Sequence, residues 1–199
     1  DLHRRRHSFP TRRSSDLLMP RLLKVVGIDV GLTSGAAAIY GYDGDCAGSP
    51  RLLTVFSLPT IGEDGGKRID VPALQEWLRK HSPDIAYIEN ATAMPSQPGP
   101  DGHRRSMGAG TMARYLRACG AIEATVACCG VQSVLIMPAV WKRAMKLSGP
   151  NKQNSVDLIR SLCPEHAATW FKYKKSHNLA EAALLSIYGA SRVDMIELK

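Results

Sequence analysis

The stretch KVVGIDVGLTSG, residues 24–35, places one acidic side chain, Asp29, inside an apolar run. The run has the composition of a buried β-strand, and the Gly, Thr and Ser residues that follow it are ordinary turn formers. An ionised carboxylate in a hydrophobic strand costs several kcal/mol unless a cation or hydrogen bonds compensate its charge. We therefore expect a compensating group beside Asp29.

Two further acidic residues stand at informative positions. Glu89 ends the strand-like segment DIAYIEN, sixty positions after Asp29 (89 minus 29), and Glu181 lies on the alanine-rich helical segment SHNLAEAALLSIYG. Functional groups of open α/β sheets gather at the carboxyl ends of the strands. Two strands and one helix that converge there would bring three carboxylates together, which indicates a divalent-metal site.

The first half of the chain predicts an antiparallel meander followed by a helix and a parallel strand. Turn signals separate three strands expected over residues 24–30, 35–42 and 51–58. Asp70 is placed to cap a helix over residues 71–81, and a fourth strand is expected over residues 84–89, parallel to the first.

The second half continues with helices and one more strand. A loop rich in Pro and Gly is expected over residues 93–105. The elements expected after it are a long helix over 106–129, a fifth strand over 131–137, and helices over 138–147, 152–162 and 176–190. The predicted fold class is α/β, with a five-stranded mixed sheet of three antiparallel strands plus parallel strands, flanked by helices.

Composition restricts the classes of protein to which the chain can belong. The sequence has 199 residues and a formal net charge of +8, and no window approaches the roughly 18 to 20 apolar residues of a membrane span. Its five cysteines form no CxxC pair and are not spaced with the histidines as in zinc fingers. We expect a protein of the reducing cytoplasm, without a membrane or zinc.

The first residues differ from the rest of the chain. Residues 1–17 lack a hydrophobic period, and their portion HSFPTRRSSDL resembles the translation of a sequencing adapter. We expect a non-native or disordered leader over residues 1–18, a start at Met19, and a single domain over residues 19–199. A basic DNA-binding arm and a targeting peptide are the alternatives. Five Arg and two Asp in residues 1–17 contribute +3, so the remainder carries +5 (8 minus 3).

The order of these elements and acids resembles the RNase H-like nuclease fold and, within it, the RuvC-type Holliday junction resolvases of the smaller phage and environmental type. The resemblance covers about residues 23–192. It rests on the motifs GIDVGLTSGAAA, AYIEN, PAVWKRAMKLSGPNKQNSVDLI and HNLAEAALLSIYG. It implies a metal-dependent endodeoxyribonuclease that acts as a homodimer. Such enzymes resolve four-way DNA junctions by paired symmetric nicks in recombination, repair or phage DNA processing.

The resemblance also implies the roles of the acids. Two Mg²⁺ or Mn²⁺ ions, roughly 3.5 to 4 Å apart, can stabilise both the attacking water and the leaving 3′ oxygen of a phosphodiester. Our hypothesis is that Asp29 bridges both ions, that Glu89 binds one and that Glu181 binds the other. No nucleotide cofactor is expected.

Two residues of the closing helix are further candidates. His177 and Asn178 stand four and three positions before Glu181, so either can share its helical face. His177 is a candidate second ligand or a base that positions water, and equally a helix cap. Asn178 is a candidate metal ligand, although the family usually has an acid or His there and has Asp at the position of Glu181.

Polar and basic residues around these motifs are candidates for contacts with DNA phosphates. Turn formation and exposure of charged side chains to solvent would equally account for these residues. Phosphate contacts would make the affinity for DNA depend on salt concentration. Trp141 is interpreted as a core residue. The candidates are Thr33, Ser34, Arg104, Arg105, Lys142, Arg143, Lys146, Lys152, Lys174 and Lys175.

Other classes compete with this reading. GIDVGLTSG is also close to the phosphate-binding turn of the actin and sugar-kinase ATPases, but those proteins need two such halves and this chain has room for one. RNA/DNA hybrid hydrolases and YqgF-like ribosomal RNA nucleases share the acids. A catalytically inactive junction-binding protein is the non-enzymatic alternative.

Overall fold

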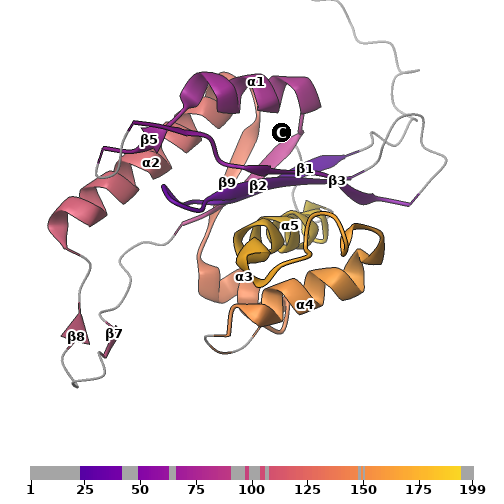
Figure 1. The fold of residues 1–199 in the computed structure, drawn as a ribbon. Coiled ribbons are helices and arrows are strands. Elements are labelled where there is room, and N and C mark those ends of the chain that lie inside the picture. Colours follow the sequence, from indigo (N-terminus) through magenta and orange to yellow (C-terminus); the bar gives the residue numbers. More distant parts are fainter. Residues whose placement is uncertain are drawn as a thin grey trace, which may run out of the picture.

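The fold was analysed in a computed structural model. It describes residues 23–41, 49–62, 66–90, 97–98, 104–105, 108–147, 149 and 151–193. Five strands form one mixed sheet in the order β3-β2-β1-β6-β9 (Figure 1). Their bounds are β1 Lys24–Asp29, β2 Ala36–Gly41, β3 Arg51–Ser57, β6 Ile85–Glu89 and β9 Gln132–Ile136. The pairs β1–β2 and β2–β3 are antiparallel, whereas β1–β6 and β6–β9 are parallel, which confirms the predicted mixed sheet.

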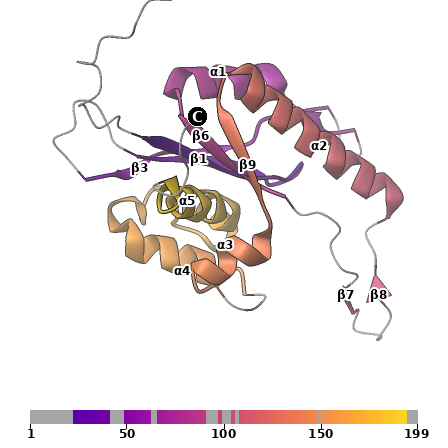
Figure 2. The same cartoon turned by 180° about the vertical axis from the view of Figure 1, so that it is seen from behind.

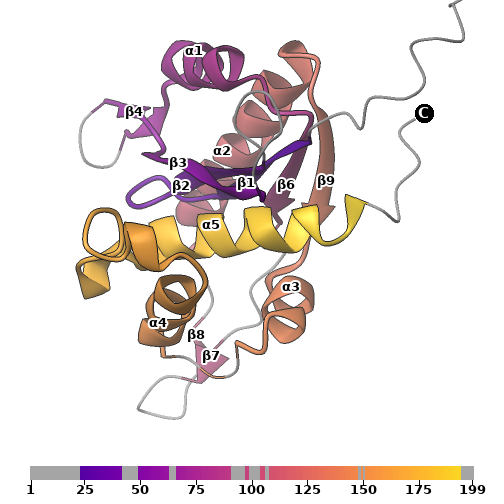
Figure 3. The same cartoon turned by 90° about the vertical axis from the view of Figure 1, so that its right-hand side faces the viewer.

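Helices cover both faces of this sheet. In Figures 1 and 3, α1 and α2 lie on one face, while α5 lies on the other with α3 and α4 beyond it. The helices are α1 Val71–His81, α2 Ala109–Cys128, α3 Pro138–Ala144, α4 Gln153–Leu162 and α5 His177–Ala190. No helix in the described part of the chain is long and apolar enough to cross a membrane.

Coverage on both faces explains the continuous apolar run of β1. Val25 belongs to the core on the α5 side, whereas Val26 and Ile28 belong to the core under α1 and α2. Successive side chains of a strand point to opposite faces of the sheet. A strand that is covered on both faces therefore needs apolar residues at odd and even positions alike.

Local signals fix the ends of α1 where the sequence predicts them. The Ala73 N–H donates to Asp70 Oδ1 at 3.2 Å, which caps the first turn. At the other end Ser82 adopts a left-handed conformation with φ 47°, and its N–H donates to the Leu78 carbonyl.

The close approach of α5 to β1 depends on Gly27. A Cβ atom on Gly27 would lie 2.3 Å from the Ala182 carbonyl oxygen and 2.4 Å from the Ser186 nitrogen. The facing helix surface is small as well, since Ala182 and Ala183 are fully buried. The sequence predicts this approach from the alanines of α5, and the glycine of β1 completes it.

Several short elements were not predicted. The predicted loop over residues 93–105 contains the two-residue strand pair β7–β8, and a second pair, β4–β5, precedes α1. Two-residue strands have no hydrophobic period, so sequence patterns do not reveal them. The helix α2 also begins after Gly108, later than the predicted residue 106. The additional elements are β4 Thr60–Ile61, β5 Arg68–Ile69, β7 Gln97–Pro98, β8 Arg104–Arg105 and the 3₁₀ turns Pro164–His166 and Lys174–Ser176.

Candidate active site

Three carboxylates meet at one end of the sheet. Asp29 is the last residue of β1, and Glu89 is the last residue of β6. These two strands are parallel neighbours, so their carboxyl ends share one edge, and α5 packs across β1 and brings Glu181 to the same edge. One ligand oxygen from each of the three side chains lies within 4.8 Å of the others. The structure therefore brings together the three acids singled out in the sequence.

The electrostatics of this cluster favour a bound cation. Burial, and then the nearby charges of Glu89 and Glu181, raise the pKa of the Asp29 carboxyl well above its ordinary value. Burial also raises the pKa of the Glu89 carboxyl. Three clustered carboxyl groups are a set of hard oxygen donors suited to Mg²⁺ or Mn²⁺. The donor set therefore fits the metal that the sequence predicts.

Hydrogen bonds orient two of the carboxylates. The Trp141 indole Nε1–H donates to Glu89 Oε2 at 2.8 Å. Glu181 accepts from the Lys142 ammonium at 2.8 Å through Oε2, and from the Ser155 hydroxyl at 3.2 Å through Oε1. Both Trp141 and Ser155 are buried. Trp141 is the core residue that the sequence predicts, but its contact with Glu89, like that of Ser155 with Glu181, was not predicted.

We expect Trp141→Phe to weaken metal binding by roughly three- to tenfold, because Glu89 loses a hydrogen bond to a charged acceptor, typically worth ~1 kcal/mol or more. Calorimetric titration with Mn²⁺ would measure the affinity. Phe retains most of the buried aromatic surface, so a large fall in thermal stability together with unchanged Mn²⁺ affinity would contradict an orienting role for Trp141.

A polar pocket of about 400 Å³ opens over the carboxylates. Its walls come from the turn after β1, from α2 and α3, and from the segment between α3 and α5. Besides the three acids, its lining includes Ser34, Tyr115, Lys142, Lys152, His177 and Asn178. A phosphodiester entering this pocket would meet carboxylates at its base and ammonium groups at its wall.

His177 and Asn178 lie beside the acidic cluster. Within the described residues, His177 is not part of the group of ligand atoms that lie within 4.8 Å of one another. Its Nε2 lies 3.1 Å from Lys152 Nζ. A lysine ammonium can only donate, so Nε2 is the acceptor in this contact. Asn178 lines the pocket one helical turn before Glu181.

The predicted phosphate-binding residues divide into three groups. Lys142 and Lys152 line the pocket, and Lys175 lines a neighbouring hollow of about 290 Å³ together with Thr33 and Ser34. Arg104 and Arg105 form β8, and their side chains lie outside the described part of the structure. The remaining candidates are exposed away from both hollows: Arg143, Lys146 and Lys174.

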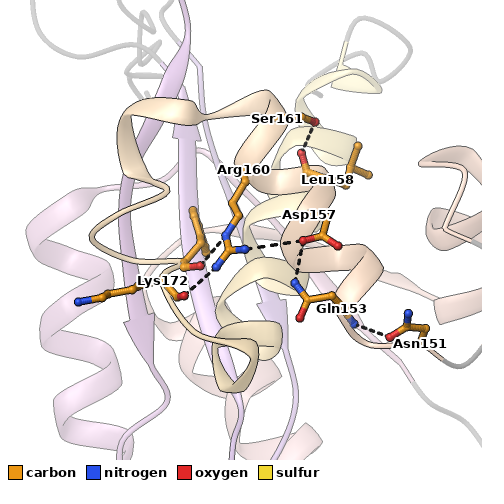
Figure 4. A network of polar contacts seen from close by, with 8 residues as sticks. Asn151, Gln153, Asp157, Leu158, Arg160, Ser161 and Lys172 are labelled. Atoms are coloured by element: carbon orange, nitrogen blue, oxygen red, sulfur yellow. Dashed lines mark hydrogen bonds and ion pairs between the residues drawn. The ribbon is translucent and has the colours of Figure 1, made fainter.

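A polar network holds the wall of the pocket formed by α4 (Figure 4). Arg160 donates to the backbone carbonyls of Phe171 and Lys172 at 2.8 and 2.7 Å, which ties α4 to the segment that leads into α5. At the start of α4, the Gln153 N–H donates to Asn151 Oδ1 at 3.1 Å. These contacts fix the backbone on either side of Lys152 and Ser155.

β9 positions α3, which forms a further wall of the pocket over the carboxylates. It runs at the edge of the sheet and leads directly into α3 (Figure 2). Trp141 and Lys142 are neighbours on α3, yet one contacts Glu89 and the other contacts Glu181. This short helix therefore holds two of the three carboxylates at once.

Comparisons with known proteins give matches in structure alone. No protein-family model matches the sequence, and no curated protein matches it. The structure of Thermus thermophilus RuvC in complex with a Holliday junction substrate is similar, with a TM-score of 0.59 and 18% identity over 87% of this chain and 96% of that chain. The Holliday junction resolvase of fowlpox virus gives a TM-score of 0.52 and 14% identity over 87% of this chain and 100% of that chain.

Both matches cover nearly the whole of the other protein. At identities below one fifth, such likeness establishes architecture. The chain has the RNase H-like fold in the form found in RuvC and the fowlpox virus Holliday junction resolvase.

Proposed function

We propose that this protein is a metal-dependent endonuclease that resolves four-way DNA junctions. The observation that carries the proposal is the cluster of Asp29, Glu89 and Glu181, whose ligand oxygens lie within 4.8 Å of one another. The fold supports it, because two structures with this architecture are Holliday junction resolvases. The pocket over the acids is polar and carries two lysines, as a site for a phosphodiester requires.

Asp29, Glu89 and Glu181 would hold the metal. Mg²⁺ or Mn²⁺ bound there would supply charge stabilisation for the phosphate and lower the pKa of the attacking water. The protein's own contribution is orientation: Trp141 fixes Glu89, and Ser155 fixes Glu181. Preorganised ligands of this kind spare the reorganisation cost at the moment of reaction.

The basic residues of the pocket would bind and orient the scissile phosphate. Lys142 and Lys152 are the two ammonium groups that line it. We assign His177 the role of holding Lys152 at the mouth of the pocket, through the 3.1 Å contact between Nε2 and Nζ. Asn178 would offer its amide oxygen beside Glu181 to a metal or to an ordered water.

Paired symmetric nicks require two active sites, and we propose a homodimer built on α2. The buried side of this helix faces the sheet, whereas a stripe of small and apolar residues on its outward side includes Leu116, which is 54% exposed. Arg117 and Glu123 flank this stripe. A Cβ atom on Gly120 would meet nothing within 4 Å, so a second helix has room to approach. The outward residues are Ala109, Ala113, Leu116, Gly120, Ala124 and Ala127.

We expect Leu116→Glu to shift the protein from dimer to monomer, because the substitution places a charge at the centre of the apolar interface. Sedimentation velocity over a range of protein concentrations would measure the shift. Leu162→Glu is the matched control, since Leu162 is 48% exposed on α4. Identical sedimentation of both variants and the wild type would place the dimer contact elsewhere.

The function itself is tested by comparing substrates. Purified protein is incubated with a labelled four-way junction, a linear duplex and an RNA/DNA hybrid, each with Mg²⁺, Mn²⁺ or a chelator. Metal-dependent paired nicks on the junction alone would support the proposal. Cleavage of the hybrid would move the assignment to another RNase H-like nuclease, and junction binding without cleavage would identify an inactive binder.

A further inference from the structure

A second pocket, of about 550 Å³, lies on the opposite face of the sheet from α5. Its walls are formed by the β4–β5 hairpin, the start of α1 and the N-terminal half of α2. Four basic side chains line it, Lys67 and Arg68 from the hairpin and Arg114 and Arg117 from α2, above an apolar floor that includes Leu32 and Ile69. We call it the basic pocket.

The described lining of the basic pocket is positively charged. Among the residues that the structure describes, no acidic side chain lines it. Arg68 and Arg117 are exposed, and within the described residues neither forms an ion pair. Cations on two facing walls, a strand and a helix, suit an extended polyanion better than one small anion.

The basic pocket lies close to the candidate active site, with a third hollow between them. Leu32 lines the basic pocket and also the hollow that contains Ser34, and Ser34 in turn lines the pocket over the carboxylates. On α2, Tyr115 lines the pocket over the carboxylates, while its neighbour Arg114 lines the basic pocket. Figure 1 shows β5 and the start of α2 at the same end of the sheet as the turn between β1 and β2.

We propose that the basic pocket binds the phosphate backbone of a duplex arm of the junction, beyond the strand held at the carboxylates. This inference rests on the proposed function and extends it to a surface that sequence motifs do not mark. Duplex DNA carries one negative charge per ~1.7 Å of its axis, so a duplex leaving the active site across the turn presents phosphates to both walls.

The test uses the full chain and the double variant Arg68→Gln/Arg117→Gln. Junction binding is measured in chelator, so that cleavage does not occur, over a series of salt concentrations. The slope of log K against log salt is expected to become shallower by about 2, one for each lost phosphate contact, with weaker binding at every salt concentration. The matched control is Arg79→Gln/Lys80→Gln, which removes two exposed charges from the far end of α1 and should keep the wild-type slope.

A second series shortens the arms of the junction by one base pair at a time. Wild-type affinity should fall once the arm no longer reaches the basic pocket, whereas the affinity of the Arg68/Arg117 variant should not show that step. A wild-type salt slope in the double variant would overturn the proposal, and so would loss of the dimer, since the pocket would then be a contact between copies. Equal binding of junction and linear duplex by the wild type would count against the proposed function, while a shallower slope of the variant on either DNA would still support the basic pocket.

Discussion

Cleavage of a four-way junction is expected to fall by on the order of 10³-fold or more when Asp29 is replaced by asparagine. Asparagine is nearly isosteric with aspartate but lacks its charge, and Asp29 is the carboxylate whose pKa is raised both by burial and by the two other acids. The measurement is the single-turnover rate of nicking of an end-labelled junction in Mg²⁺. Junction affinity in chelator should be retained, because the proposed DNA contacts are made by the basic residues around the pocket.

Asp84→Asn provides the control for this substitution. Asp84 precedes β6 at the end opposite to Glu89, where it accepts from the Lys24 N–H at 2.9 Å, and asparagine retains an acceptor for that bond. We expect near-wild-type cleavage from this control. Retained cleavage by Asp29→Asn would instead remove Asp29 from the catalytic set.

The same variant is expected to be more stable than the wild type at neutral pH when metal is absent. Folding raises the Asp29 pKa, first through burial and then through Glu89 and Glu181. A carboxyl group that binds its proton more tightly in the folded state destabilises that state as pH rises from the unfolded pKa, about 3.9, through the raised folded value. Urea unfolding in chelator between acidic and neutral pH should show this loss in the wild type and a smaller loss in the variant. Parallel pH profiles would contradict the assignment of the shift to Asp29.

The second large effect is expected from Gly27→Ala, which should lower the free energy of unfolding by about 3 kcal/mol or more. The added Cβ atom would lie 2.3 Å from the Ala182 carbonyl oxygen and 2.4 Å from the Ser186 nitrogen. Both are backbone atoms of α5, so no side-chain rotation relieves the clash and the helix must move. Because Glu181 adjoins Ala182, this movement should also weaken Mn²⁺ binding. Urea unfolding and calorimetric titration would measure the two effects.

Gly110→Ala is the matched control, because it adds the same methyl group where nothing lies within 4 Å. Gly110 lies in the first turn of α2, where alanine is the better helix former by up to about 1 kcal/mol. We therefore expect equal or greater stability from this control. If Gly27→Ala were equally harmless, α5 would not sit this close to β1.

Sequence alone could predict the elements with a regular pattern of apolar residues, and the residues that interrupt such a pattern. The apolar run of β1 predicts a buried strand because both faces of the sheet are covered. Asp29 stands out because a charged residue interrupts that run. The position of Glu89 at the carboxyl end of a strand, and the family motif that contains Glu181, predicted that both acids lie near Asp29, and the structure brings the three together.

The remaining contacts of the site depend on tertiary packing. Trp141 contacts Glu89, and Ser155 contacts Glu181, because α3 and α4 pack on the same side of the sheet as α5. No local sequence pattern predicts that packing. Lys142 illustrates the same limit, since the sequence marks it as a surface charge for DNA and the structure pairs it with Glu181 at 2.8 Å. The basic pocket likewise assembles charges from a hairpin and a helix that lie apart in the chain.

The packing of α5 on β1 makes the three-acid site depend on the completed fold. Asp29 and Glu181 are separated by 152 positions (181 minus 29), so the site does not exist in a nascent or partly folded chain that has not closed this contact. Any metal that binds only the closed arrangement draws the folding equilibrium toward it, in proportion to the logarithm of metal concentration over Kd. Under the proposed function, a chain that can cut DNA is thereby also a chain that has finished folding.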